Sequence, residues 1–338
     1  MAQQLDVEKA ALVGEPVTVA DRAASISVVA PGLVAYRGAT GGRQLTWMDR
    51  SGTARGTIGD PDGSLQHPRV SPDGRRVTAS RAVQGNRDIW LFDGTRTSRL
   101  TFDAGEVPLW SPDGMRIVFR SVRTGGMNLY QTLASGGGVD ESLVVSEQTK
   151  AATSWSRDGR FVLFMSNDVR TSSDLWVVPT TGDRTPSVVL KAPFREAYGA
   201  FSPDTRWVAY HSNESGRNEI YVRPFVAPGA TGAPSGGRWQ VSATGGVHPV
   251  WRHDGKELYY LNPTGAMMAV TIAVGGSTIA PGVPVLLFRT RIYAGGQDDQ
   301  LGRQYDVASD GRFLINMVLG DAAEPITLIQ NWHPEGKE

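Results

Sequence analysis

Short runs of alternating apolar and polar residues recur along this chain, and most of them follow a turn rich in Pro, Asp and Gly. Such runs occupy residues 76–79, 117–119, 161–164, 207–210, 258–261 and 313–315. Alternation with a period of two places every second side chain on the same face of a sheet. The pattern therefore predicts an all-β protein built from many short antiparallel strands.

The turns before these runs repeat one sequence motif. Its clearest copies are Ser71-Pro72-Asp73-Gly74 and Ser111-Pro112-Asp113-Gly114, and weaker copies carry Asp158, Asp204, Asp254 and Asp310. Pro presets φ for the turn, Asp accepts hydrogen bonds from nearby backbone N–H groups, and Gly tolerates a left-handed backbone. The acidic residues are separated by 40, 45, 46, 50 and 56 positions. A repeat of this length, made of strands and turns, is typical of a β-propeller blade.

A second motif, a polar residue followed by an aliphatic and an aromatic one, lies 15 or 16 residues after four of the turn Asp residues. Its copies are Asp88-Ile89-Trp90, Asn128-Leu129-Tyr130, Asp174-Leu175-Trp176 and Glu219-Ile220-Tyr221. We interpret these segments as the third strand of each blade. Their aromatic residues are expected to pack between neighbouring blades, because large aromatic area stabilises contacts between sheets.

The motifs predict one β-propeller domain over residues 1–338, with seven four-stranded antiparallel blades; six blades are the alternative. A divergent first blade is expected near 26–60, because residues 27–36 read as strand, turn and strand and 44–49 as a further strand. The other blades are expected near 67–105, 107–147, 152–193, 199–244, 248–290 and 303–334. A strand within 12–20, at Val17-Thr18-Val19, is expected to close the ring against the last blade, since closure removes exposed sheet edges.

The composition narrows the classes of function. The chain has 338 residues, 34 Lys and Arg, 34 Asp and Glu, and no cysteine. A formal net charge of zero argues against nucleic-acid binding, which needs a dense cationic surface. We expect no membrane span, because no stretch approaches ~20 apolar residues, and the first nine residues lack the features of a secretory signal. Cys-ligated metals and disulfides are excluded.

The paired turn and third-strand motifs resemble those of TolB-like propellers, which are related to WD-repeat domains. Further segments resemble the propeller that follows the kinase domain in bacterial Ser/Thr protein kinases: 47–52, 213–217, 221–225, 254–261 and 331–332. The resemblance implies a sensory or protein-binding module, in a periplasmic or extracytoplasmic setting. The extra α/β domain of TolB and the motifs of a kinase domain are missing from this sequence.

No catalytic, cofactor or metal site is predicted. The sequence has no Gly-x-Ser-x-Gly nucleophile motif, no histidine pair at metal-ligand spacing and no calcium loop. The positions expected to open the innermost strands are His67, Val107, Thr153, Tyr198, His248 and Gln304, so carboxylates are scarce there. His67-Pro68 and His248-Pro249 occupy matching positions, as polar residues of the channel mouth or as solvated turn residues.

The loops that lead into the innermost strands are polar and aromatic, and they converge on the central channel. Converging polar groups on a rigid scaffold are the usual place for recognition. The expected binding face consists of His67, Glu106, Arg195, Tyr198, His248, Arg303 and Gln304. Our leading hypothesis is a non-catalytic, monomeric module that binds a protein or peptide partner there and needs no cofactor. The alternatives are a metal-dependent propeller enzyme of the lactonase or lyase type, and the propeller of a peptidase without its hydrolase domain.

Overall fold

The computed structural model describes residues 2–6, 11–17, 23–29, 33–38, 42–168, 170, 172–230, 237–297, 302–320 and 326–329. Before Gly42 and after Gly320 the description covers the backbone of the strands. The described residues form strands and turns without a helix, so the predicted all-β class is confirmed. Two compact units are present, Met1–Gly42 with Val318–Glu338 and Arg43–Met317.

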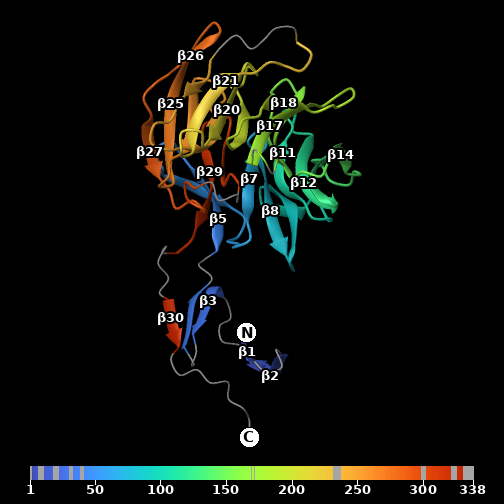
Figure 1. Cartoon of the computed structure of the whole chain (residues 1–338), viewed down its shortest axis with the longest axis vertical. Coiled ribbons are helices and arrows are strands. Elements are labelled where there is room, and N and C mark those ends of the chain that lie inside the picture. The colour runs from blue at the N-terminus through green and yellow to red at the C-terminus, as the bar shows by residue number, and fades with distance from the viewer. Residues whose placement is uncertain are drawn as a thin grey trace. The chain divides into compact units, whose positions relative to one another are not determined.

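The second unit is a six-bladed β-propeller of four-stranded antiparallel sheets (Figure 1). From the innermost strand outward, the first three blades are β7(Gln66–Val70), β8(Arg76–Val83), β9(Asn86–Asp93) and β10(Arg96–Arg99); β11(Glu106–Trp110), β12(Arg116–Thr124), β13(Gly126–Leu133) and β14(Glu141–Val144); and β15(Lys150–Trp155), β16(Phe161–Asp168), β17(Ser172–Pro179) and β18(Ser187–Leu190).

The remaining three blades are β19(Glu196–Phe201), β20(Trp207–Ser212), β21(Glu219–Pro224) and β22(Trp239–Gln240); β23(Val247–Trp251), β24(Glu257–Leu261), β25(Ala266–Gly275) and β27(Val285–Arg289), with β26(Thr278–Pro281) paired to the far end of β25; and β28(Tyr305–Val307), β29(Phe313–Val318), β5(Arg43–Met48) and β6(Ala54–Ile58).

The sixth blade corrects two of our predictions. Its two inner strands come from the end of the chain and its two outer strands from near the beginning, with β29 next to β5. The predicted seventh blade at 26–60 is wrong, because residues 43–58 complete this blade. The prediction that Val17-Thr18-Val19 closes the ring is also wrong, since β5 takes that place; of these residues, Thr18 and Val19 lie outside the described part.

The first unit contains two small sheets. β1(Ala2–Asp6) pairs with β2(Ala11–Val17) in an antiparallel hairpin. β3(Ala23–Val29), β4(Leu33–Gly38) and β30(Ile326–Ile329) form a three-stranded antiparallel sheet. The two strands expected within 27–36 are therefore present, but β4 pairs with a strand from the end of the chain instead of with 44–49.

The core of the propeller consists of six clusters of buried apolar side chains, and each cluster joins two neighbouring blades. The cluster between blades 6 and 1, for example, combines Leu45, Trp47 and Leu314 with Val77 and Phe92. The third-strand aromatics Trp90, Tyr130, Trp176 and Tyr221 all belong to or pack against such clusters, as predicted. Burial at the blade junctions therefore holds the ring together.

The strand order gives the ring two different faces. The face with the Asp turns, between first and second strands, is called the turn face. The opposite face carries the loops that lead into the innermost strands and the hairpins between second and third strands, and it is called the loop face. At the turn face, Ser71 Oγ donates to Asp73 Oδ1 (2.5 Å) and accepts from the backbone N–H of Arg76 (2.9 Å), while Gly74 has φ +72°. Ser111 and Asp113 repeat this hydrogen-bonded turn in blade 2.

Candidate functional site

The innermost strands of the blades surround a central channel, and five of them carry a β-bulge near the loop face. The register shifts lie between Gln66 and Arg69, Glu106 and Leu109, Ala152 and Ser154, Ala197 and Ala200, and Val247 and Val250. A bulge adds a residue to one strand and redirects its side chain. The bulges include five of the six positions named from the sequence; the sixth, Gln304, directly precedes β28.

Four of the bulged residues have a left-handed backbone although none is glycine: His67 (φ 55°), Val107 (φ 52°), Tyr198 (φ 51°) and His248 (φ 58°). Such a backbone costs ~1–2 kcal/mol per L-residue. Strain of this kind persists where the surrounding contacts enforce it, and it clusters at functional sites. Its repetition in four blades makes this ring of positions the first candidate for function.

Side chains from opposite sides of the ring meet inside the channel. The Tyr198 ring lies 4.4 Å from the ring of His248 and 5.3 Å from that of His211, centroid to centroid. A Cβ at residue 302 would lie 2.7 Å from His67 Nε2 and 3.8 Å from the Tyr198 hydroxyl, so there is little room for a side chain at Gly302 (φ +76°). These aromatic and imidazole groups therefore fill the channel beneath the loop face.

Hydrogen bonds tie the bulges to the neighbouring blades. The backbone N–H of Val107 donates to Ser80 Oγ at 3.1 Å, and the same hydroxyl lies 3.1 Å from His67 Nδ1. The backbone N–H of His248 donates to His211 Nδ1 at 3.2 Å. Ser80 and His211 each stand seven residues after a turn Asp, so one structural device occurs in two blades.

The seven residues of the predicted binding face do not lie on one surface. His67, Tyr198, His248 and Gln304 are at most 7% exposed, and they lie in the channel instead of on an open surface. Gln304 Oε1 accepts a hydrogen bond of 2.8 Å from Asn316 Nδ2.

The other three residues lie elsewhere. Glu106 forms ion pairs with Arg120 (2.7 Å) and Arg87 (3.3 Å) in blades 2 and 1. The backbone N–H of Arg195 donates to Asn213 Oδ1 in blade 4. Arg303 lies farther along the channel, towards the turn face. His211 and Arg69 also belong to the channel but were not predicted from the sequence; in both cases the available signal was a charged or polar residue within an apolar strand.

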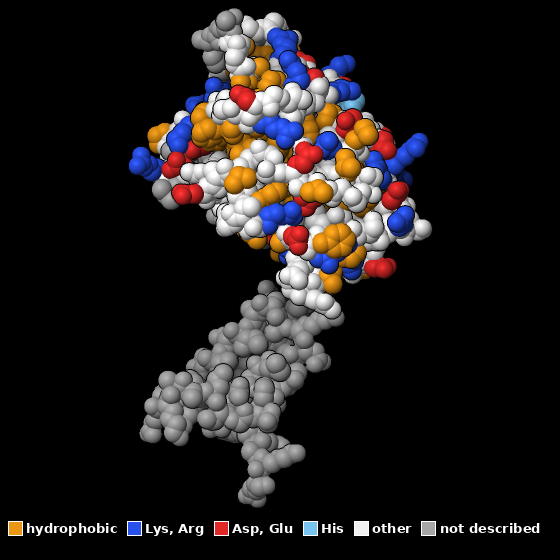
Figure 2. Space-filling view, turned by 90° about the vertical axis from the view of Figure 1, so that its right-hand side faces the viewer, with side chains coloured by type: hydrophobic (Ala, Val, Ile, Leu, Met, Phe, Trp, Pro, Cys, Tyr) orange, Lys and Arg blue, Asp and Glu red, His pale blue; other side chains and the backbone are white. Residues whose placement is uncertain are grey.

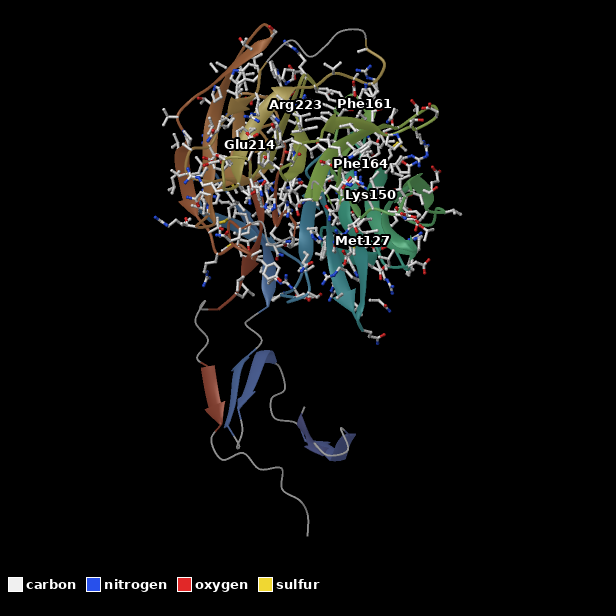
Figure 3. All side chains as sticks on the ribbon, in the orientation of Figure 1. Met127, Lys150, Phe161, Phe164, Glu214 and Arg223 are labelled. Carbon is white, nitrogen blue, oxygen red and sulfur yellow. The ribbon has the colours of Figure 1, made fainter. Side chains whose placement is uncertain are left out.

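Two hollows open near the junction of blades 2 and 3. One, of about 330 Å³, is lined by Val145, Lys150, Phe164 and Trp176 among others, and Figure 3 shows Lys150 next to Phe164 there. Burial lowers the pKa of Lys150, whose Nζ donates to Asn128 Oδ1, the Ser146 carbonyl and the Gln148 carbonyl. Three acceptors use all three of its N–H donors, so we assign Lys150 a structural role. The second hollow, of about 610 Å³, lies between the 147–149 loop and the β16–β17 hairpin.

Exposed apolar side chains stand on the loop face at three consecutive blade junctions. Phe102 is 68% exposed, Val145 54% and Phe194 42%, and each belongs to a loop that leads to an innermost strand. On the flank formed by blades 2 and 3, Figure 2 shows apolar side chains among charges of both signs. Exposed apolar groups within a polar surround mark contact sites for other proteins.

Within the part of the chain that the structure describes, no three His, Asp or Glu side chains are grouped so that they could hold a metal ion. The same residues include no helix that could cross a membrane.

Comparison with known proteins identifies the repeat. A family model described as "TolB beta propeller domain" matches residues 34–177. No curated protein matches the chain. Among solved structures, the putative TolB from Agrobacterium tumefaciens superposes with a TM-score of 0.62 at 14% identity, covering 83% of this chain and 100% of that one. TolB from Acinetobacter baumannii gives 0.55 at 16% identity, covering 73% and 65%. An oligogalacturonate lyase in complex with manganese gives 0.53 at 13% identity, covering 82% and 98%. At these identities, the structural matches show a shared fold.

Proposed function

We propose that this chain, a TolB-like β-propeller, is a non-catalytic module that binds a protein or peptide partner at its loop face. The observation that carries the proposal is the row of exposed apolar side chains at three neighbouring blade junctions, Phe102, Val145 and Phe194. They stand on loops that a rigid ring holds in place, and such loops commonly carry recognition. The two hollows near Val145 provide recesses into which partner side chains can insert.

The buried channel residues close the channel beneath the loop face and hold its loops in place. His67, Tyr198 and His248 fill the channel beneath the loops, so a partner meets a closed floor instead of an open pore. We assign these residues a positioning role, since they fix the loops that precede the innermost strands. Arg195, which is half-buried in one of these loops, stays a candidate for direct contact.

We further propose that the module acts as a monomer, either as the accessory region of a bacterial Ser/Thr kinase or as a TolB-like periplasmic protein. A metal-dependent propeller enzyme remains the second hypothesis of the sequence analysis. It requires converging carboxylates or histidines, and no observation in the described residues favours it. Metal analysis of the purified chain, with and without EDTA, tests it: stoichiometric metal and an EDTA-dependent drop in melting temperature would support the enzyme.

The binding proposal is tested by quantitative capture from an extract of cells that carry the gene. The full chain is compared with Phe102→Ser/Phe194→Ser on the loop face and with Met115→Ser/Val139→Ser on the turn face, whose residues are 66% and 90% exposed. We expect the loop-face variant to lose its captured partner while the turn-face variant keeps it. Equal capture by both folded variants would contradict the proposal.

A further inference from the structure

The channel contains a second feature, a cavity near the turn face, which the loop-face proposal does not use. It has a volume of about 260 Å³ and is lined by all six blades. Its lining includes one layer of equivalent inner-strand residues: Arg69, Leu109, Ser154, Ala200, Val250 and Asp306. Trp110, Trp155, Phe201 and Trp251 add aromatic surface. The cavity is a little smaller than typical small-molecule sites of ~300–1,000 Å³.

Two buried arginines give this cavity an excess of positive charge. Arg69 is 4% exposed and Arg303 8%. The carboxylate of Asp306 is the acidic group in the lining, and it accepts hydrogen bonds from Arg303 Nη2 (3.1 Å) and from the backbone N–H of Val70 (2.9 Å). Only Arg303 of the two is paired with this carboxylate, whose charge acts on Arg69 without a hydrogen bond between them. Burying a charge without a partner is costly, and like charges raise the cost further.

The hydrogen bonds of the two arginines are incomplete. Arg69 Nη1 donates to the carbonyls of Pro68 (2.8 Å) and Arg303 (3.5 Å), whereas Nε of Arg69 and Nε of Arg303 have no partner. Burial, and then the neighbouring charge of Arg303, lower the pKa of Arg69 to about 9. Arg69 therefore still carries its charge at neutral pH, next to a cavity that can hold an anion.

We propose that this cavity binds a carboxylate whose negative charge lies between Arg69 and Arg303 and whose flat apolar part lies against Trp110, Phe201 and Trp251. A single negative charge matches the excess of one positive charge among the buried charged groups, Arg69, Arg303 and Asp306. The exposed Arg157 adds a third guanidinium group to the lining. Arginine pairs well with carboxylates because its planar N–H groups match both oxygens. The carboxylate is that of a free small aromatic acid or the C-terminus of a peptide that ends in an aromatic residue.

The test is isothermal titration calorimetry on the full chain with indole-3-acetate, with the hexapeptide Gly-Gly-Ser-Gly-Ala-Trp, and with the amide of each. We expect each acid to bind at least about tenfold more tightly than its amide, as expected when a hydrogen-bonded charge is removed. Tighter binding of the peptide acid assigns the site to a chain terminus, and tighter binding of indole-3-acetate assigns it to a small acid. Equal affinity of acids and amides, or no binding of either acid, overturns the proposal.

Three arginine variants complete the test. Arg69→Met removes one buried charge and is expected to lower acid affinity at least about tenfold, with Arg69→Lys intermediate because it keeps the charge without the planar donors. Arg123→Met, which breaks an ion pair with Asp140 outside the cavity lining, is the matched control and is expected to bind like the unmodified chain.

Unchanged affinity for the acids in folded Arg69→Met contradicts the proposed site. If Arg69→Met does not fold, unchanged affinity in Arg69→Lys contradicts it. The loop-face variant Phe102→Ser/Phe194→Ser should keep acid binding, so failure of one proposal is distinguishable from failure of the other.

Discussion

The backbone N–H of His248 donates a hydrogen bond to Nδ1 of His211, so a strained residue of blade 5 is fixed by the second strand of blade 4. We predict that His211→Leu, which removes this acceptor, destabilises the chain by about 1–3 kcal/mol, the cost of leaving a buried donor without a partner. Urea unfolding followed by tryptophan fluorescence measures the difference. His253→Leu on the exposed rim is the control, and equal effects of the two substitutions would contradict the prediction.

The turn of blade 4 contains Thr205 at the position where the other blades have glycine, and its φ is 59°. We predict that Thr205→Gly stabilises the chain by about 1 kcal/mol, because glycine adopts this backbone without steric cost. The opposite exchange in blade 1, Gly74→Thr (φ +72°), should destabilise it. Both values come from thermal unfolding. A Thr205→Gly variant that melts lower than the unmodified chain would show that the turn is not strained.

Glu196, at the start of β19, is 2% exposed, and burial together with the negative charges of Asp174 and Glu214 raises its pKa to about 7. Arg223 acts in the opposite direction. Between pH 4.5 and 7 the folded chain thus binds a proton that the unfolded chain has lost, so stability falls as the pH rises through this window.

We therefore predict that Glu196→Gln raises the free energy of unfolding by about 1–3 kcal/mol relative to the unmodified chain at pH 8, and changes it little at pH 4.5. Unfolding free energies measured across this pH range test the prediction. Glu147→Gln, an exposed substitution on the same face, should follow the unmodified chain. A gain that does not depend on pH would mean that the carboxylate of Glu196 is not the cause.

Ring closure depends on β5, whose Leu45 is fully buried between blades 6 and 1. Leu45→Ala should cost about 2–5 kcal/mol through lost burial and a residual cavity, whereas Leu133→Ala, at a residue that is 37% exposed, should cost much less. Guanidinium unfolding of the two variants provides the comparison. A small effect at Leu45 would indicate that residues 43–48 are not part of the ring.

The repeat could be read from the sequence because its turns have specific chemistry. Ser71 and Asp73 satisfy each other and the adjacent backbone, so their spacing marks a blade wherever it recurs. The positions in or directly before the six innermost strands, from His67 to Gln304, followed from the same spacing. Blade number was harder, because alternation identifies a strand but not its partner: β5 and β29 pair although more than 260 residues separate them.

The direction of individual side chains could not be predicted in the same way. Glu106 opens an innermost strand, yet Arg120 and Arg87 hold its carboxylate in ion pairs. Arg69 and Asp306 occupy equivalent positions in adjacent blades, and only the closed ring brings them to one cavity. A charged residue within an apolar strand marked each position as unusual, but it did not show which other residue lies nearby. The blade next to the first one is encoded partly at the end of the chain, so the sequence did not indicate that Arg69 and Asp306 meet at this cavity.

We propose that recognition takes place on the loop face, and photo-crosslinking in living cells is the decisive experiment. A photoreactive phenylalanine analogue is placed at Phe102 or Phe194 on the loop face, and at Met115 or Val139 on the turn face, in otherwise unmodified chains. We expect a discrete protein adduct from the loop-face positions and none from the turn-face positions. Adducts from Met115 or Val139 alone, or the absence of any adduct at Phe102 and Phe194, would contradict it.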